Sequence, residues 1–164
     1  MKRFSLIILA LVLAFGLALA SCDNGTAGGG TDSALNGRWL LFTNGNIHRY
    51  YSFTFSNGEY TFRLNGEEGT GYRGMYTTSG NNLTLTTTAF YADSVMAYVT
   101  GTTMGWKDKS QLTEIWRQQG YSDAEIDRIF IGEGFSGTKC TYSISDDFLR
   151  VDGSTYGGTY IKDR

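Results

Sequence analysis

The chain has 164 residues, and its 14 basic and 16 acidic side chains give a net charge of −2 at neutral pH. A chain of this length is long enough for one domain with one hydrophobic core. Nucleic-acid-binding domains normally present a basic face, so this balance argues against a nucleic-acid partner. The sequence contains 22 glycines, no proline and 15% aromatic residues, which favours a β-rich fold with tight turns.

The N-terminus has the three parts of a secretory signal peptide. Lys2 and Arg3 form a short positive region, an apolar run covers residues 6–20, and small residues follow it. An apolar run of about 15 residues is shorter than the roughly 20 residues that a membrane-spanning helix needs. We therefore predict a signal peptide over residues 1–21.

The sequence Leu19-Ala20-Ser21-Cys22 resembles the lipobox of bacterial lipoproteins. The resemblance implies cleavage before Cys22, a lipid thioether on its sulfur and usually acylation of the new amine. Two or three acyl chains would hold the protein on a membrane, whereas one chain binds only marginally. A plain signal peptide with a chance cysteine, or an uncleaved anchor, is the alternative. Removing residues 1–21 takes away two basic residues and no acidic one, so the mature chain has a net charge of −4.

The location implied by this resemblance is the cell envelope, with the protein secreted across the inner membrane and lipid-anchored. Asp23 follows the cysteine. In some bacteria an acidic residue at this position helps to retain a lipoprotein in the inner membrane, but the rule varies between lineages. The choice of membrane stays open, with the outer membrane favoured.

Residues 22–34 are rich in glycine, threonine and serine, and we predict a flexible tether there. The folded domain is expected to cover residues 35–164. Alternating apolar and polar residues, separated by turn signals such as Asn57-Gly58, predict a series of strands in it. The predicted strands are 37–42, 51–55, 60–64, 72–78, 83–88, 93–100, 138–145, 148–152 and 157–162.

The alternation gives way to a helical period between residues 110 and 131. Ser110 is expected to begin a helix that ends at Gly120, and Ser122 with Glu125 forms a capping-box pattern for a second helix. Their apolar stripe is expected to pack on the sheet as a lid or plug, or else to be exposed and bind a partner. The stripe comprises Ile115, Trp116, Ile126, Ile129 and Phe130, and the first helix also contains Leu112.

A weak internal repeat ends in Tyr-x-Gly-x-Tyr, once at residues 72–76 and again at residues 156–160. In each copy a glycine lies between two tyrosines expected to face inward, which permits sharp curvature or a close approach of backbones. Curved antiparallel strands with one apolar face are how a sheet closes into a barrel.

The opening Leu35-Asn-Gly-Arg-Trp39 and the meander of hairpins after it resemble the lipocalin-like (calycin) barrels. The resemblance covers about residues 35–164 and implies that Trp39 closes the floor of the barrel. The expected fold is mainly all-β, an antiparallel up-and-down β-barrel of about 8–9 strands with a two-helix insertion near 110–131. A lipocalin usually places its helix after the last strand, so the insertion departs from that pattern.

The interior of such a barrel is either filled by side chains or holds one small ligand. The residues expected to line it are Phe53, Phe55, Phe62, Tyr72, Tyr76 and Tyr160. We therefore predict a membrane-anchored envelope lipoprotein that binds a small hydrophobic or amphipathic ligand in its barrel. The alternative is a surface module with a filled barrel and no ligand that binds another protein, whose identity the sequence leaves unknown.

An enzyme, such as an envelope hydrolase, is the least expected function. His48 is the sole histidine, and the acidic pairs Glu67-Glu68 and Asp146-Asp147 fall at turns, where neighbouring carboxylates point apart. Residues 69–74 match the dinucleotide pattern G-x-G-x-x-G, but a strand is expected after them instead of a helix. Cys140 alternates with Tyr142 and Ile144, which predicts a buried core thiol. We expect no catalytic residue, no metal and no cofactor.

Overall fold

The computed structural model describes residues 30–64, 66, 69–153 and 156–164. The chain divides into two units, residues 1–30 and 31–164, and the second unit is the packed domain. The predicted signal peptide, Cys22 and most of the predicted tether lie outside the described residues. Within the described part of the chain, no helix has the length and apolar character needed to cross a membrane.

The domain is built mainly from strands. They are β1 (Gly37–Thr43), β2 (Asn46–Ser56), β3 (Glu59–Arg63), β4 (Gly71–Ser79), β5 (Asn82–Ala92), β6 (Gly105–Asp108), β7 (Thr138–Ser145), β8 (Phe148–Asp152) and β9 (Gly158–Lys162). A 3-10 turn, η1 (Ser33–Leu35), precedes β1. The segment between β5 and β7 also contains the helices α2 (Ser94–Thr100), α3 (Lys109–Gln118) and α4 (Asp123–Gly132).

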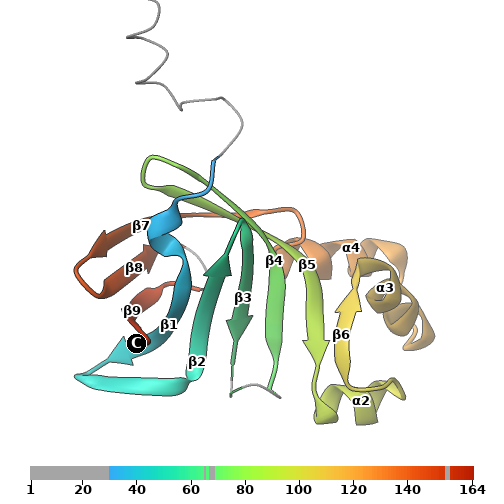
Figure 1. Ribbon diagram of the computed structural model, residues 1–164. Coiled ribbons are helices and arrows are strands. Elements are labelled where there is room, and N and C mark those ends of the chain that lie inside the picture. The colour runs from blue at the N-terminus through green and yellow to red at the C-terminus, as the bar shows by residue number, and fades with distance from the viewer. Residues whose placement is uncertain (1–29, 65, 67–68, 154–155) are drawn as a thin grey trace, which may run out of the picture. The chain divides into compact units, whose positions relative to one another are not determined.

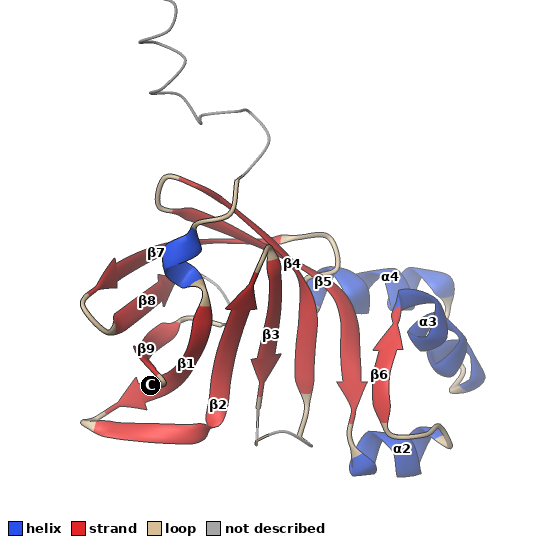
Figure 2. Cartoon of the chain, viewed as in Figure 1, coloured by secondary structure: helices blue, strands red, loops and turns tan. Residues whose placement is uncertain are grey.

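Eight of the strands form a closed antiparallel barrel, which confirms the predicted fold class (Figures 1 and 2). Each barrel strand pairs with the next one along the chain, β5 pairs with β7, and β9 returns to pair with β1. The connectivity is therefore an up-and-down meander interrupted once, between β5 and β7.

Strand β5 is where the sheet divides. One edge of β5 pairs with β4 along its whole length. On the other edge, residues 82–85 pair with β7, and residues 89–92 pair with the extra strand β6. Figure 1 shows α3 and α4 beyond this branch, on the side of the domain where β6 lies. The predicted insertion therefore occupies the place where β5 changes its partner.

The prediction of a strand over residues 93–100 is wrong, because this segment forms helix α2. The Asp93 carboxylate caps the helix by accepting a hydrogen bond from the backbone N–H of Met96 at 2.9 Å. Gly101 ends it in the left-handed conformation, with φ 68°. The strand β6 that follows was not predicted.

The two predicted helices of the insertion are confirmed. Asp108 caps helix α3, two residues before the expected cap Ser110, and it forms a capping box with Gln111. Helix α4 begins after Ser122 as predicted, and the Glu125 carboxylate accepts the backbone N–H of Ser122 at 2.8 Å.

The packed domain begins at Thr31, four residues before the expected Leu35. Asp32 makes the difference, because its carboxylate accepts hydrogen bonds from the Ala34 backbone N–H and from the Tyr142 hydroxyl, at 2.9 and 2.7 Å. These contacts fix the last residues of the expected tether against β7.

Candidate functional site

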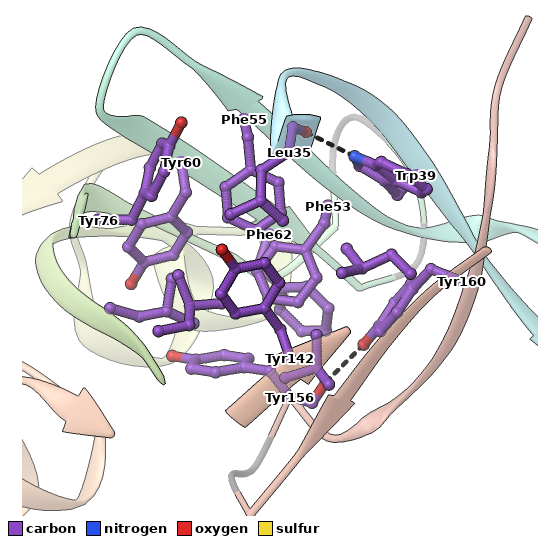
Figure 3. Close-up of a cluster of buried hydrophobic side chains, with 14 of the residues drawn as sticks. Leu35, Trp39, Phe53, Phe55, Tyr60, Phe62, Tyr76, Tyr142, Tyr156 and Tyr160 are labelled. Atoms are coloured by element: carbon purple, nitrogen blue, oxygen red, sulfur yellow. Dashed lines mark hydrogen bonds between the residues drawn. The ribbon is translucent and has the colours of Figure 1, made fainter. Parts of the chain in front are cut away.

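Five of the six predicted ligand-lining residues belong to one packed cluster inside the barrel (Figure 3). Phe53, Phe55, Phe62, Tyr76 and Tyr160 are each at most 6% exposed. The ring centroid of Phe53 lies 4.7 Å from that of Phe62 and 5.3 Å from that of Tyr160. These rings fill the space between them, and a ligand contact for any of the five stays a prediction.

The polar ends of these buried side chains are paired. The Trp39 indole donates to the Leu35 carbonyl, and the Tyr160 hydroxyl donates to the Tyr156 carbonyl, both at 2.7 Å. Trp39 is fully buried, and its role in closing the floor of the barrel stays a prediction. Each partner is a backbone carbonyl, so these bonds fix the two rings in the barrel wall.

A chain of hydrogen bonds connects the barrel to the segment after α4. The Thr87 hydroxyl donates to the Glu133 carbonyl at 2.9 Å and lies 2.9 Å from the Tyr60 hydroxyl. Thr87 has one hydroxyl proton, so Tyr60 is the donor in the second bond. Burial raises the pKa of Tyr60 well above its ordinary value.

Tyr72, the sixth predicted residue, lies at the side of the barrel and is half-buried. Its ring centroid is 5.8 Å from that of Tyr156 in the barrel core and 5.3 Å from that of Phe90 on β5. Burial raises the pKa of Tyr72, and the neighbouring carboxylate of Glu133 raises it further. Tyr72 therefore joins the barrel core to the structure around the insertion.

The apolar stripe of the insertion is largely buried in a cluster of its own with Phe90, Met96 and Phe135, and a role as a lid or plug of the barrel stays a prediction. Leu112, Ile126 and Phe130 are buried together, and Trp116 packs against them. Ile115 is 8% exposed, and Ile129 is half-buried. The exposed interpretation of this stripe is therefore wrong.

A cavity of about 180 Å³ lies between this stripe and β5. Side chains from β5, all three helices and the residues after α4 line it. They are Phe90, Met96, Leu112, Trp116, Ile129, Phe130, Glu133 and Phe135. Seven of these eight lining residues are apolar, and Glu133 is the exception. The cavity is therefore an apolar site with one carboxylate.

Sequence reasoning identified only part of this lining. The two predicted helices supplied Leu112, Trp116, Ile129 and Phe130, whereas four lining residues were not identified: Phe90, Met96, Glu133 and Phe135. Phe90 is out of phase with the inward alternation of Leu83 and Leu85, so that pattern did not mark it. Met96 was assigned to a strand that is in fact helix α2, and no pattern marked Glu133 or Phe135.

The candidates for other chemistry within the described residues do not line this cavity. His48 is in β2, Asp146 and Asp147 form the turn between β7 and β8, and Glu67 and Glu68 lie outside the described residues. Across the described ranges, no group of three or more His, Cys, Asp or Glu side chains is placed to hold a metal ion. Gly71 opens strand β4, so the G-x-G-x-x-G match lacks the helix that a dinucleotide site requires.

Cys140 is the buried core thiol that the alternation predicted. It is 6% exposed, and its Sγ donates to the Leu83 carbonyl at 3.4 Å. A reactive cysteine needs exposure and a positively charged environment, so this position suits packing better than redox or nucleophilic chemistry.

Comparisons with known proteins give no functional assignment. No family model matches the chain, and no curated protein matches it. A solved structure of an uncharacterised protein from Bacteroides eggerthii is similar, with a TM-score of 0.38 and 15% sequence identity. The match covers 78% of this chain and 96% of the other chain.

Proposed function

We propose that this protein is an envelope lipoprotein that binds a small hydrophobic or amphipathic ligand where its barrel meets the helical insertion. The observation that carries the proposal is the apolar cavity beside β5. Ligand sites are typically concave and mostly apolar, with a few polar groups that orient the ligand. The cavity has this character, and it differs from the barrel interior proposed on sequence grounds, where aromatic rings pack against one another.

The size of the cavity limits the ligand. An apolar protein cavity of about 150 Å³ is large enough to bind benzene. A cavity of about 180 Å³ therefore takes a single ring, a short branched chain or a head group of that size, with any longer portion outside. The side chain of Met96 adapts readily to different shapes, because it is unbranched and has a polarizable sulfur.

Anchoring through Cys22 is the second part of the proposal, and it is supported by the lipobox-like sequence alone. We expect cells given labelled palmitate to label the wild-type protein and not Cys22→Ser, which should leave the membrane fraction. Cys140→Ser is the matched control, because its thiol is buried in the barrel, and it should keep the label. A labelled Cys22→Ser protein would contradict the lipoprotein assignment.

Filling the cavity is expected to abolish ligand binding while the fold survives. Ile129 lines the cavity, so the Ile129→Trp side chain should occupy the space that a ligand needs. We expect the dissociation constant for small apolar probes, from benzene to short branched alcohols, to rise by about tenfold or more. Ligand-observed NMR on the purified protein measures this constant.

Ile131→Trp is the control for this substitution. Ile131 is on the same helix, but it is 64% exposed and does not line the cavity. The same added volume should therefore leave binding unchanged. If wild-type protein binds none of the probes, or if both variants bind as wild type does, the cavity is not the ligand site.

A further inference from the structure

Four aromatic rings surround the cavity, and they come from different elements of the domain. Phe90 is on β5, Trp116 on α3, Phe130 on α4, and Phe135 on the segment that follows α4. We call these four residues the aromatic cage. The Phe130 and Phe135 ring centroids are 4.9 Å apart, with their planes inclined at 59°. These two rings are therefore inclined to each other, and all four aromatic residues line one space.

The cage is electron-rich and carries one negative charge. The face of an aromatic ring attracts cations through its quadrupole. Glu133 also lines the cavity, and it is the one acidic residue among the eight lining residues. Its carboxylate is a hydrogen-bond partner of the neighbouring Tyr72. A neutral ring or alkyl chain would gain no electrostatic binding energy from that charge. A cation would be attracted by both the carboxylate and the rings.

One ring of the cage already contacts a cation within the protein. The Lys109 Nζ lies 5.0 Å from the centroid of Phe130, within the range of a cation–π interaction. Lys109 itself is exposed to solvent. The Phe130 ring therefore already packs against one ammonium group of the protein.

We propose that the aromatic cage binds an alkylated ammonium group of the trimethylammonium type. The inference rests on the proposed function and names the chemical class of its ligand. A primary ammonium carries three N–H donors that need acceptors, and the lining side chains offer a single carboxylate. A quaternary ammonium has no N–H to satisfy, so it can leave water for a cavity of aromatic faces with one counter-charge.

The test compares two ligands of equal shape that differ in charge. Choline has a trimethylammonium group, and its tert-butyl isostere has the same volume without the charge. We expect choline to bind the purified protein about tenfold or more tightly than the isostere. In Glu133→Gln, choline should lose this advantage while the isostere binds as before, as measured by isothermal titration calorimetry.

Glu114→Gln is the matched control for net charge. Glu114 is exposed on α3 and does not line the cavity, so choline should bind this variant as it binds wild type. Equal binding of choline and its isostere to wild type would contradict ammonium binding by the aromatic cage. It would leave the proposal of an apolar ligand site intact. If neither ligand binds and the small apolar probes also do not bind, both the ammonium site and the proposed function are contradicted.

The trimethylammonium group can belong to a free solute or to a lipid head group. Phosphatidylcholine vesicles are the second arm of the test, with vesicles of an uncharged glycolipid as the reference. Binding of free choline alone identifies a solute. Additional binding to phosphatidylcholine vesicles that Glu133→Gln removes identifies a lipid head group.

Discussion

Gly74→Ala is expected to lower the free energy of unfolding by about 3 kcal/mol or more, because the added methyl group has no room. A Cβ at this position would lie 1.9 Å from the carbonyl oxygen of Thr86 and 2.9 Å from the Cα of Thr87. Both atoms belong to the backbone of the paired strand β5, so no side-chain rotation relieves the clash. Chemical denaturation followed by circular dichroism measures the loss.

Gly132→Ala separates this steric effect from the general effect of replacing glycine. Gly132 is the last residue of α4, and a Cβ built there meets nothing within 4 Å. Alanine favours helix and restricts the unfolded chain, so this variant should be as stable as wild type or slightly more stable. A Gly74→Ala protein of wild-type stability would show that β4 and β5 can separate at this point.

The same glycine explains why the barrel could be predicted from the sequence. The Tyr-x-Gly-x-Tyr pattern indicated a close approach of backbones, and the contact of Gly74 with Thr86 confirms it. The register of β4 on β5 also shifts between Arg73 and Gly74, a β-bulge or similar irregularity that was not predicted. The alternation of inward apolar residues predicted the other barrel strands, since one face of each strand must be buried.

The error at residues 93–100 arose where two local signals compete. Val95 and Val99 favour a strand, and the Ser-Val-Met-Ala-Tyr-Val-Thr segment is too short for its apolar period to identify a helix. The hydrogen bond from the Met96 backbone N–H to Asp93 and the left-handed Gly101 determine the outcome. These two residues at the ends of the segment were better evidence than the valines between them.

The cavity could not be predicted, because it depends on a change of partner within one strand. Residues 82–85 of β5 pair with β7, but Phe90 lies where β5 pairs with β6. Nothing in the alternation of β5 marks that division. Only the division allows Phe90 to meet the stripe of α3 and α4 instead of the barrel core. Tyr72 was nevertheless predicted as a site residue, and its ring contacts Phe90 in the cavity wall.

Phe53→Ala is expected to lower the free energy of unfolding by about 3–5 kcal/mol. Phe53 is fully buried and lies at the centre of the aromatic cluster. Its ring centroid is within 6.3 Å of five others, those of Phe55, Tyr60, Phe62, Tyr156 and Tyr160. Because these rings hold one another in place, truncation leaves a space that they cannot fully close.

Phe148→Ala is the matched control, since Phe148 is 39% exposed and packs edge-on against Phe42. Its loss should be no more than about 1 kcal/mol, in line with a half-exposed ring. Equal losses in the two variants would contradict a packed barrel interior and favour a hollow one.

The milder variant Phe53→Leu also tests where the ligand binds. A ligand in the cavity beside β5 does not contact Phe53, because that residue is absent from the cavity lining. Phe53→Leu should therefore bind apolar probes with wild-type affinity although it is less stable, while Ile129→Trp should be stable and fail to bind. The opposite result would place the ligand among the barrel aromatics, as the sequence alone predicted. The two variants thus separate the packing role of the aromatic interior from the binding role that we assign to the insertion.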